Sequence, residues 1–148
     1  MRDIQELMDR LAIRELIEKY TVCVTRRDWD GMISCFLEDG RWITSVGHDL
    51  AGVAAIREGI MAAVAPRKFL MQMTHGMTID RLDADSAETT SILHEFAVED
   101  SIFVLGTYHD QLAKVGGEWK FRERFFQVHY MDMGAQPGQV MVDYATLR

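Results

Sequence analysis

Between residues 69 and 130 the chain is divided into segments in which apolar and polar side chains alternate as they do in β-strands. Short turn-like sequences, such as Gly116-Gly117, separate these segments. Strands joined by such turns pair as consecutive antiparallel hairpins, and long strands curl strongly. This part of the chain therefore predicts one curved antiparallel sheet. Its expected strands are residues 69–82, 87–98, 102–115 and 118–130.

The chain before residue 69 is mostly helical by its apolar spacing. We expect helices at residues 3–27, 28–39 and 53–64, with a short strand at residues 41–46. Helices that precede a long meander are typical of an α+β fold with the helices on one face of one sheet. A curled sheet closed by helices is cone-shaped and encloses an apolar pocket. The expected buried side of the second helix, capped by Asp28, is Met32, Ile33, Phe36 and Leu37.

Length and charge bound the functions that the chain can serve. Its 148 residues make a single domain, with an expected core at residues 3–130 and an irregular tail at residues 131–148. The net charge of −7, without a basic run, makes nucleic acid an unlikely partner. We expect no membrane segment, no leader and a cytoplasmic location, because the apolar runs are too short. Cys23 and Cys35 are interpreted as reduced packing residues.

His75 stands in a row of alternate apolar residues on the first long strand, so its imidazole is expected to face the hydrophobic interior. A buried imidazole is more often structural than catalytic, but burial would also keep it neutral and able to accept a proton near neutral pH. Whether His75 is a core residue or a general base stays open at this point. The complete row is Met71, Met73, His75, Met77 and Ile79.

Candidate pocket residues lie on the other strands as well. His94 and Phe96 share an apolar face of the second long strand. On the third strand either Tyr108 and Asp110 face the pocket or His109 does, and the periodicity leaves both possibilities open. In the last strand, Arg122, Arg124, Phe126 and Val128 oppose Trp119, Phe121 and Phe125, and these mixed faces predict a local bulge.

The sequence contains no arrangement that indicates a cofactor. No histidine pair has metal-ligand spacing, no Gly-x-Ser-x-Gly elbow indicates a serine nucleophile, and no glycine-rich phosphate loop is present. We therefore expect neither a metal nor another cofactor.

Several short motifs in a fixed order carry a family resemblance. They are the segment from Leu11 to Tyr20, then Arg27-Asp-Trp-Asp30, Phe36-Leu-Glu-Asp39, Thr74-His75 and Gly117-Glu-Trp-Lys-Phe121. With this order, residues 3–130 resemble the SnoaL-like branch of the nuclear-transport-factor-like superfamily. The resemblance implies a cystatin-like α+β roll with a mixed or antiparallel sheet around a deep apolar pocket, often assembled as homodimers or homotrimers.

The superfamily includes scytalone dehydratase, polyketide cyclases and ketosteroid isomerases, and the resemblance makes His75 the equivalent of the dehydratase's catalytic histidine. Thr25 stands where the dehydratase has the aspartate that orients this histidine, and Val24 stands where it has a tyrosine. The missing carboxylate would otherwise fix the tautomer of the imidazole. Asp110 is the hypothetical replacement partner of His75. Other expected pocket residues are Tyr20, Val24, Thr25, Trp29, Trp42, His94, Phe96, Tyr108, Arg124 and Phe126.

These residues predict a cofactor-independent dehydratase, isomerase or cyclase that acts on a small hydrophobic cyclic or aromatic molecule. In this hypothesis His75 is the general base, with Tyr108 and Asp110 as further catalytic residues. The alternatives are a non-catalytic protein that binds such a molecule and a structural subunit of the same fold.

Overall fold

The computed structural model describes residues 3–98, 102–132 and 134, and the expected irregular tail lies largely outside this range. The helices are α1 (Ile4–Arg26), α2 (Trp29–Ile33) and α3 (Val53–Val64). The strands are β1 (Phe36–Thr44), β2 (Asp49–Ala51), β3 (Leu70–Leu82), β4 (Ser86–Ala97), β5 (Phe103–Val115) and β6 (Glu118–Asp132).

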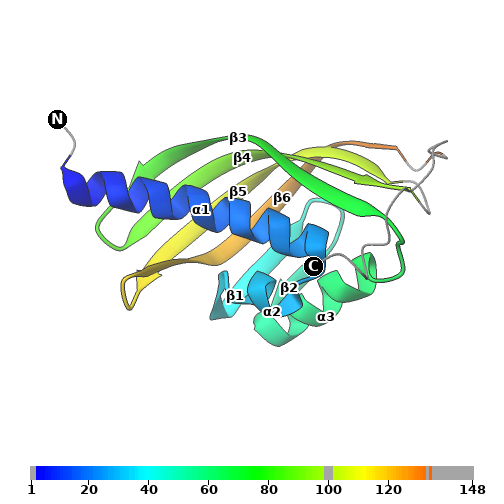
Figure 1. The fold of residues 1–148 in the computed structure, drawn as a ribbon, viewed down its shortest axis with the longest axis horizontal. Helices are drawn as coiled ribbons and strands as arrows, with labels where there is room; N and C mark the ends of the chain where they lie inside the picture. The colour runs from blue at the N-terminus through cyan, green and yellow to red at the C-terminus, as the bar shows by residue number, and fades with distance from the viewer. Residues whose placement is uncertain (1–2, 99–101, 133, 135–148) are drawn as a thin grey trace.

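All six strands belong to one mixed sheet with the order β2-β1-β6-β5-β4-β3. The meander from β3 to β6 is antiparallel as expected, whereas β1 lies parallel to β6. Helix α1 crosses one face of the curved sheet, and α2 and α3 lie beside β1 and β2 (Figure 1). We call the face under α1 the inner face and the opposite one the outer face. The predicted α+β fold with N-terminal helices on one sheet is confirmed.

Local signals at the helix ends explain where α1 and α2 begin. The Asp3 side chain accepts a hydrogen bond from the backbone of Glu6, and Asp28 accepts one from Gly31, so each aspartate caps a helix. The cap at Asp28 was predicted from the sequence. Arg27 ends α1 in a left-handed conformation, and its N–H bonds to the last carbonyls of the helix. In the part of the chain that the structure describes, no helix is long and apolar enough to cross a membrane.

The second helix is shorter than predicted. It ends at Ile33, and Phe36 and Leu37 belong to β1. Phe36 pairs with Phe121 of β6, and the backbone of Phe121 donates a hydrogen bond to Cys35. Pairing with a strand far along the chain thus overrides a local helical pattern, which sequence spacing alone cannot detect. The short strand β2 was not predicted.

Bulges change which side chains of β3 face inward. Thr74 pairs with Leu93 and Gly76 with Ile92, so His75 is an extra residue without a partner in the ladder. Before it Leu70, Gln72 and Thr74 face inward, and after it Met77 and Ile79 pack against the core. The predicted inward position of His75 is therefore wrong, because the apolar row crosses the bulge; its side chain is exposed on the outer face.

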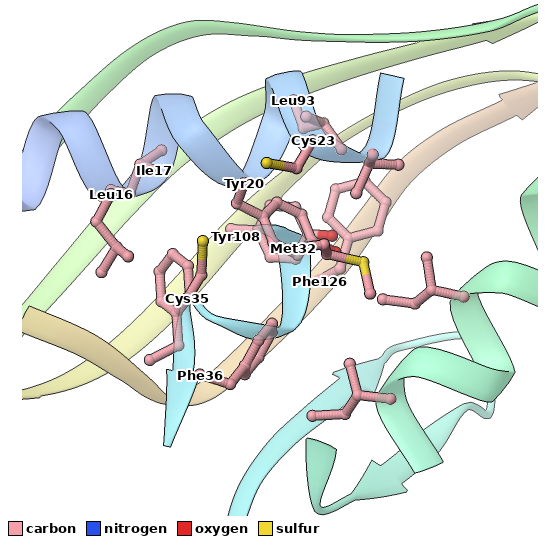
Figure 2. Packing of buried hydrophobic residues seen from close by; sticks show 14 of the residues in the cluster. Leu16, Ile17, Tyr20, Cys23, Met32, Cys35, Phe36, Leu93, Tyr108 and Phe126 are labelled. Carbon is pink, nitrogen blue, oxygen red and sulfur yellow. The ribbon is translucent and has the colours of Figure 1, made fainter. Parts of the chain in front are cut away.

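The main core lies between α1 and the inner face (Figure 2). Tyr20 of α1 packs edge-on against Phe36, Tyr108 and Phe121, with ring centroids 5.9 to 6.1 Å apart. Cys23 and Cys35 are buried free thiols in this core, in agreement with their interpretation as packing residues.

Candidate functional site

A cavity of about 280 Å³ opens between the inner face, α3 and the β1–β2 hairpin. This volume is close to the lower limit of small-molecule pockets. Its wall is mostly apolar, and polar side chains enter it from the strands and from the residues after α3. The apolar wall includes Leu50, Ile60, Val64, Leu70, Leu93, Ile102, Val104, Phe126 and Val128.

Glu95 is the carboxylate of this cavity. It faces inward on β4 opposite Gln72, whose side-chain Nε2 donates a 2.6 Å hydrogen bond to Glu95 Oε2. Burial raises the pKa of Glu95, and the hydrogen bond from Gln72 and the charge of Arg67 offset only part of this effect. A raised pKa brings a carboxyl closer to the pH range in which it can both donate and accept a proton.

A hydrogen-bonded aromatic group forms another part of the wall. The indole Nε1 of Trp42 donates a 3.2 Å hydrogen bond to the Tyr108 hydroxyl, and Tyr20 packs against Tyr108 beside Phe126 (Figure 2). Burial raises the pKa of Tyr108, so the phenol stays protonated at neutral pH. The charge of Glu95 also acts to raise the pKa of both tyrosines, which places the carboxyl near them. The cavity wall thus contains a carboxyl, that of Glu95, which can transfer a proton, and a phenol, that of Tyr108, which can donate a hydrogen bond.

Arg124 and Asp110 form a buried ion pair behind this aromatic group. Arg124 Nε lies 2.8 Å from Asp110 Oδ1, and Nη2 lies 3.0 Å from Oδ2. The guanidinium carbon is 3.8 Å from the Tyr108 ring centroid and 4.3 Å from that of Tyr20. Burial by itself would lower the pKa of Arg124, but Asp110, Tyr108 and Tyr20 together raise it, so the guanidinium stays charged. The pair acts as a fixed support for the tyrosines.

The predicted histidine centre does not form. His75 and His94 stack on each other on the outer face, with ring centroids 5.7 Å apart, and neither lines the cavity. Asp110 lies on the inner face with Arg124, so its expected pairing with His75 is wrong. Phe96 also lies on the outer face, because the inward row of β4 is the other one, which contains Leu93 and Glu95.

The remaining predicted residues divide between the cavity and the core. Tyr20, Trp42, Tyr108 and Phe126 line the cavity as expected. Val24 and Trp29 pack in or against the core instead. Thr25 accepts a 3.0 Å hydrogen bond from the backbone N–H of Gln72, which ties α1 to β3 next to the cavity. Gln72 thus occupies the inward position near Thr25 that the sequence assigned to His75.

Sequence reasoning missed Glu95, Gln72 and Arg67. Glu95 belongs to a row of mostly small or polar residues, Ala87, Thr89, Ser91, Leu93, Glu95 and Ala97, whereas the outward row is more apolar. Choosing the more apolar row therefore selected the wrong face. The predicted bulge in β6 is present, since Arg122 falls between the pairs Phe121–Leu112 and Glu123–Gln111, and it turns Arg124 inward.

The curled sheet, the helices that cover it and the cavity between them together define an α+β roll. The sequence model of the SnoaL-like domain matches residues 5–125, and the chain belongs to this family. None of the curated proteins matches it.

Solved structures share the fold at low sequence identity. The chain is similar to a hexachlorocyclohexane dehydrochlorinase, LinA-type3, from Novosphingobium barchaimii, with 20% identity, a TM-score of 0.83, and coverage of 94% of this chain and 99% of that one. It is similar to a candidate scytalone dehydratase from Novosphingobium aromaticivorans, with 16% identity, a TM-score of 0.79, and coverage of 91% and 97%. A cystatin-like protein of unknown function from Nostoc punctiforme has 22% identity, a TM-score of 0.72, and coverage of 82% and 91%.

Proposed function

We propose that this protein is a cofactor-independent lyase or isomerase for a small hydrophobic cyclic molecule, with Glu95 as the proton-transferring group. The observation that carries the proposal is a carboxyl of raised pKa that is oriented by Gln72 inside an apolar cavity. Glu95 takes the role that the sequence assigned to His75, which lies outside the cavity.

Proton transfer in this cavity would be assisted by the phenol of Tyr108. A base removes a proton next to a carbonyl more easily when a hydrogen bond stabilises the oxyanion that develops. The Trp42 indole orients the Tyr108 oxygen. The positive charge of Arg124, next to the Tyr108 ring, favours negative charge that develops near the phenol. The names of two structural relatives, a dehydrochlorinase and a candidate scytalone dehydratase, make eliminations the first reactions to test.

The test is a turnover screen with small cyclic substrates that carry an acidic C–H next to a carbonyl or a leaving group. We expect Glu95→Gln to lower kcat by about 10²- to 10⁴-fold, the usual contribution of a general acid or base. His75→Ala is the matched control and should keep the wild-type rate, because its side chain is exposed on the outer face. Equal turnover by wild type and Glu95→Gln would remove Glu95 from the mechanism.

A non-catalytic binding protein is the second candidate. It is favoured by one observation. Where α1 contacts β3, Thr25 is bonded to Gln72, and the histidine–carboxylate pair of the dehydratase is not formed there. Saturable ligand binding without turnover across the screen would support this candidate. A purely structural subunit is less consistent with this structure, because the chain's own side chains do not fill the cavity.

A further inference from the structure

Two polar atoms at the cavity have no partner. Among the described residues, buried side-chain atoms without a hydrogen bond are Arg67 Nε, Gln72 Oε1, His94 Nε2 and Arg124 Nη1. Arg67 and Gln72 both line the cavity. A buried polar atom without a partner destabilises the structure, so such atoms are normally satisfied by water or by a ligand.

These two atoms belong to side chains that line the same cavity as Glu95 and act on its carboxyl. Gln72 gives its amide N–H to Glu95, so its carbonyl oxygen is left as an acceptor. The charge of Arg67 also acts on Glu95, and its Nε–H is left as a donor. Both side chains are held in place: Arg67 Nη1 donates to the Ala63 carbonyl at the end of α3, and Gln72 Nε2 donates to Glu95 while its backbone N–H donates to Thr25.

The free acceptor Gln72 Oε1 and the free donor Arg67 Nε limit which functional group a ligand can place beside Glu95. A ketone, an ether or a carboxylate only accepts and would leave Gln72 Oε1 unpaired, and an ammonium group only donates and would leave the Arg67 Nε–H unpaired. A hydroxyl group donates one hydrogen bond and accepts others, so it satisfies both atoms without a net charge. The apolar wall and the volume of about 280 Å³ suit a single ring behind this hydroxyl.

We propose that the cavity binds a neutral cyclic alcohol whose hydroxyl donates to Gln72 Oε1 and accepts from Arg67 Nε. Gln72 and Arg67 are then the specificity-determining residues of the site. This inference rests on the proposed function only in taking the same cavity as the ligand site, so it is tested by binding and not by turnover.

The test compares three ring compounds of similar size by calorimetric titration: cyclohexanol, cyclohexanone and methylcyclohexane. We expect the wild type to bind cyclohexanol about tenfold more tightly than cyclohexanone, because the ketone leaves one buried acceptor unpaired, and a factor of ten is about 1.4 kcal/mol. Methylcyclohexane, which pairs neither atom, should bind more weakly than both.

Two variants separate the two contacts. Gln72→Leu should remove most of the preference for the alcohol over the ketone, whereas Arg67→Met should weaken both and leave methylcyclohexane unchanged. An unchanged Kd for methylcyclohexane also shows that the cavity of each variant is intact. His75→Ala, on the outer face, should match the wild type with all three compounds.

Three results would overturn the inference: equal affinities of the wild type for cyclohexanol and cyclohexanone, an unaltered alcohol preference in Gln72→Leu, or no saturable binding of cyclohexanol. Selective binding of the alcohol together with unchanged turnover in Glu95→Gln would uphold this inference and reject the catalytic proposal.

Discussion

Arg124 and Asp110 place two charges in the centre of the fold, and Arg124 is only 1% exposed. Burial by itself would raise the pKa of Asp110, and the guanidinium opposes this with its charge and two hydrogen bonds. Such a pair is costly to break because each partner leaves the other charge buried, whereas removing both together is much less harmful. The Arg124–Asp110 pair therefore links the stability of the fold to the position of the cavity tyrosines.

Breaking this pair should destabilise the protein strongly. We expect Arg124→Met to lower the free energy of unfolding by about 3–5 kcal/mol, since Asp110 then stays buried without its partner. The double variant Arg124→Met, Asp110→Leu should recover a large part of this loss. Urea unfolding of the three proteins checks the expectation, and a double variant no more stable than Arg124→Met would contradict it.

Glu95 should make stability depend on pH. Because its folded-state pKa is raised, the folded protein holds this proton more tightly than the unfolded chain, so its contribution to stability is lost as pH rises above about 4, the ordinary range of a glutamic acid. Glu95→Gln, which stays neutral, should gain stability relative to wild type at pH 8 and lose this gain near pH 4. Denaturant titrations at both pH values measure the difference; a gain that is independent of pH would argue against the raised pKa.

At the scale of the elements, bulges decide which residues reach the cavity. The extra residues His75 and Asp80 in β3, and Arg122 and His129 in β6, each shift the inward parity of the strand that follows. The shift after His75 turns Met77 and Ile79 inward, and the shift after Arg122 turns Arg124 inward. The mixed faces of β6 predicted its bulge from the sequence. The bulge of β3 was not predicted, because alternate residues are apolar both before and after His75.

The close approach of β5 and β6 requires glycine at position 106. A Cβ there would lie 2.4 Å from the backbone oxygen of Gln127 and 2.7 Å from the Phe126 ring. We expect Gly106→Ala to cost about 1–3 kcal/mol through strain in a packed region. Gly76→Ala is the matched control in β3, since a Cβ at Gly76 meets no atom within 4 Å. Thermal unfolding compares the two, and equal melting temperatures would contradict the steric argument.

At the scale of the whole molecule, the outer face of the sheet is unusually apolar. Ile92 is 50% exposed and Tyr130 is 53% exposed, and none of the described helices covers this face. Met71, Phe96, Phe103, Leu105 and Phe125 are partly exposed beside them. Exposed apolar areas of this kind mark interaction surfaces, so we predict that the expected homodimer or homotrimer would form through this face.

Self-association through this face stays a prediction. Light scattering coupled to size-exclusion chromatography should give the mass of a dimer or trimer for the wild type, and Ile92→Lys should shift it toward the monomer because a charge would be buried in the contact. An exposed substitution away from this face, such as Val22→Lys on α1, serves as the control. A monomeric wild type at high concentration would refute the prediction.

The sequence by itself determined that helices precede an antiparallel meander, the cap of α2, the family, and four residues of the cavity wall: Tyr20, Trp42, Tyr108 and Phe126. These features depend on local chemistry and on periodicity, which a chain carries with it. Which face of each strand points inward was decided only by the tertiary structure, because a bulge reverses the alternation of faces and an apolar row has the same sequence pattern on the inner and the outer face. For that reason the sequence pointed to His75, and the folded chain places Glu95, Gln72 and Arg67 around the cavity.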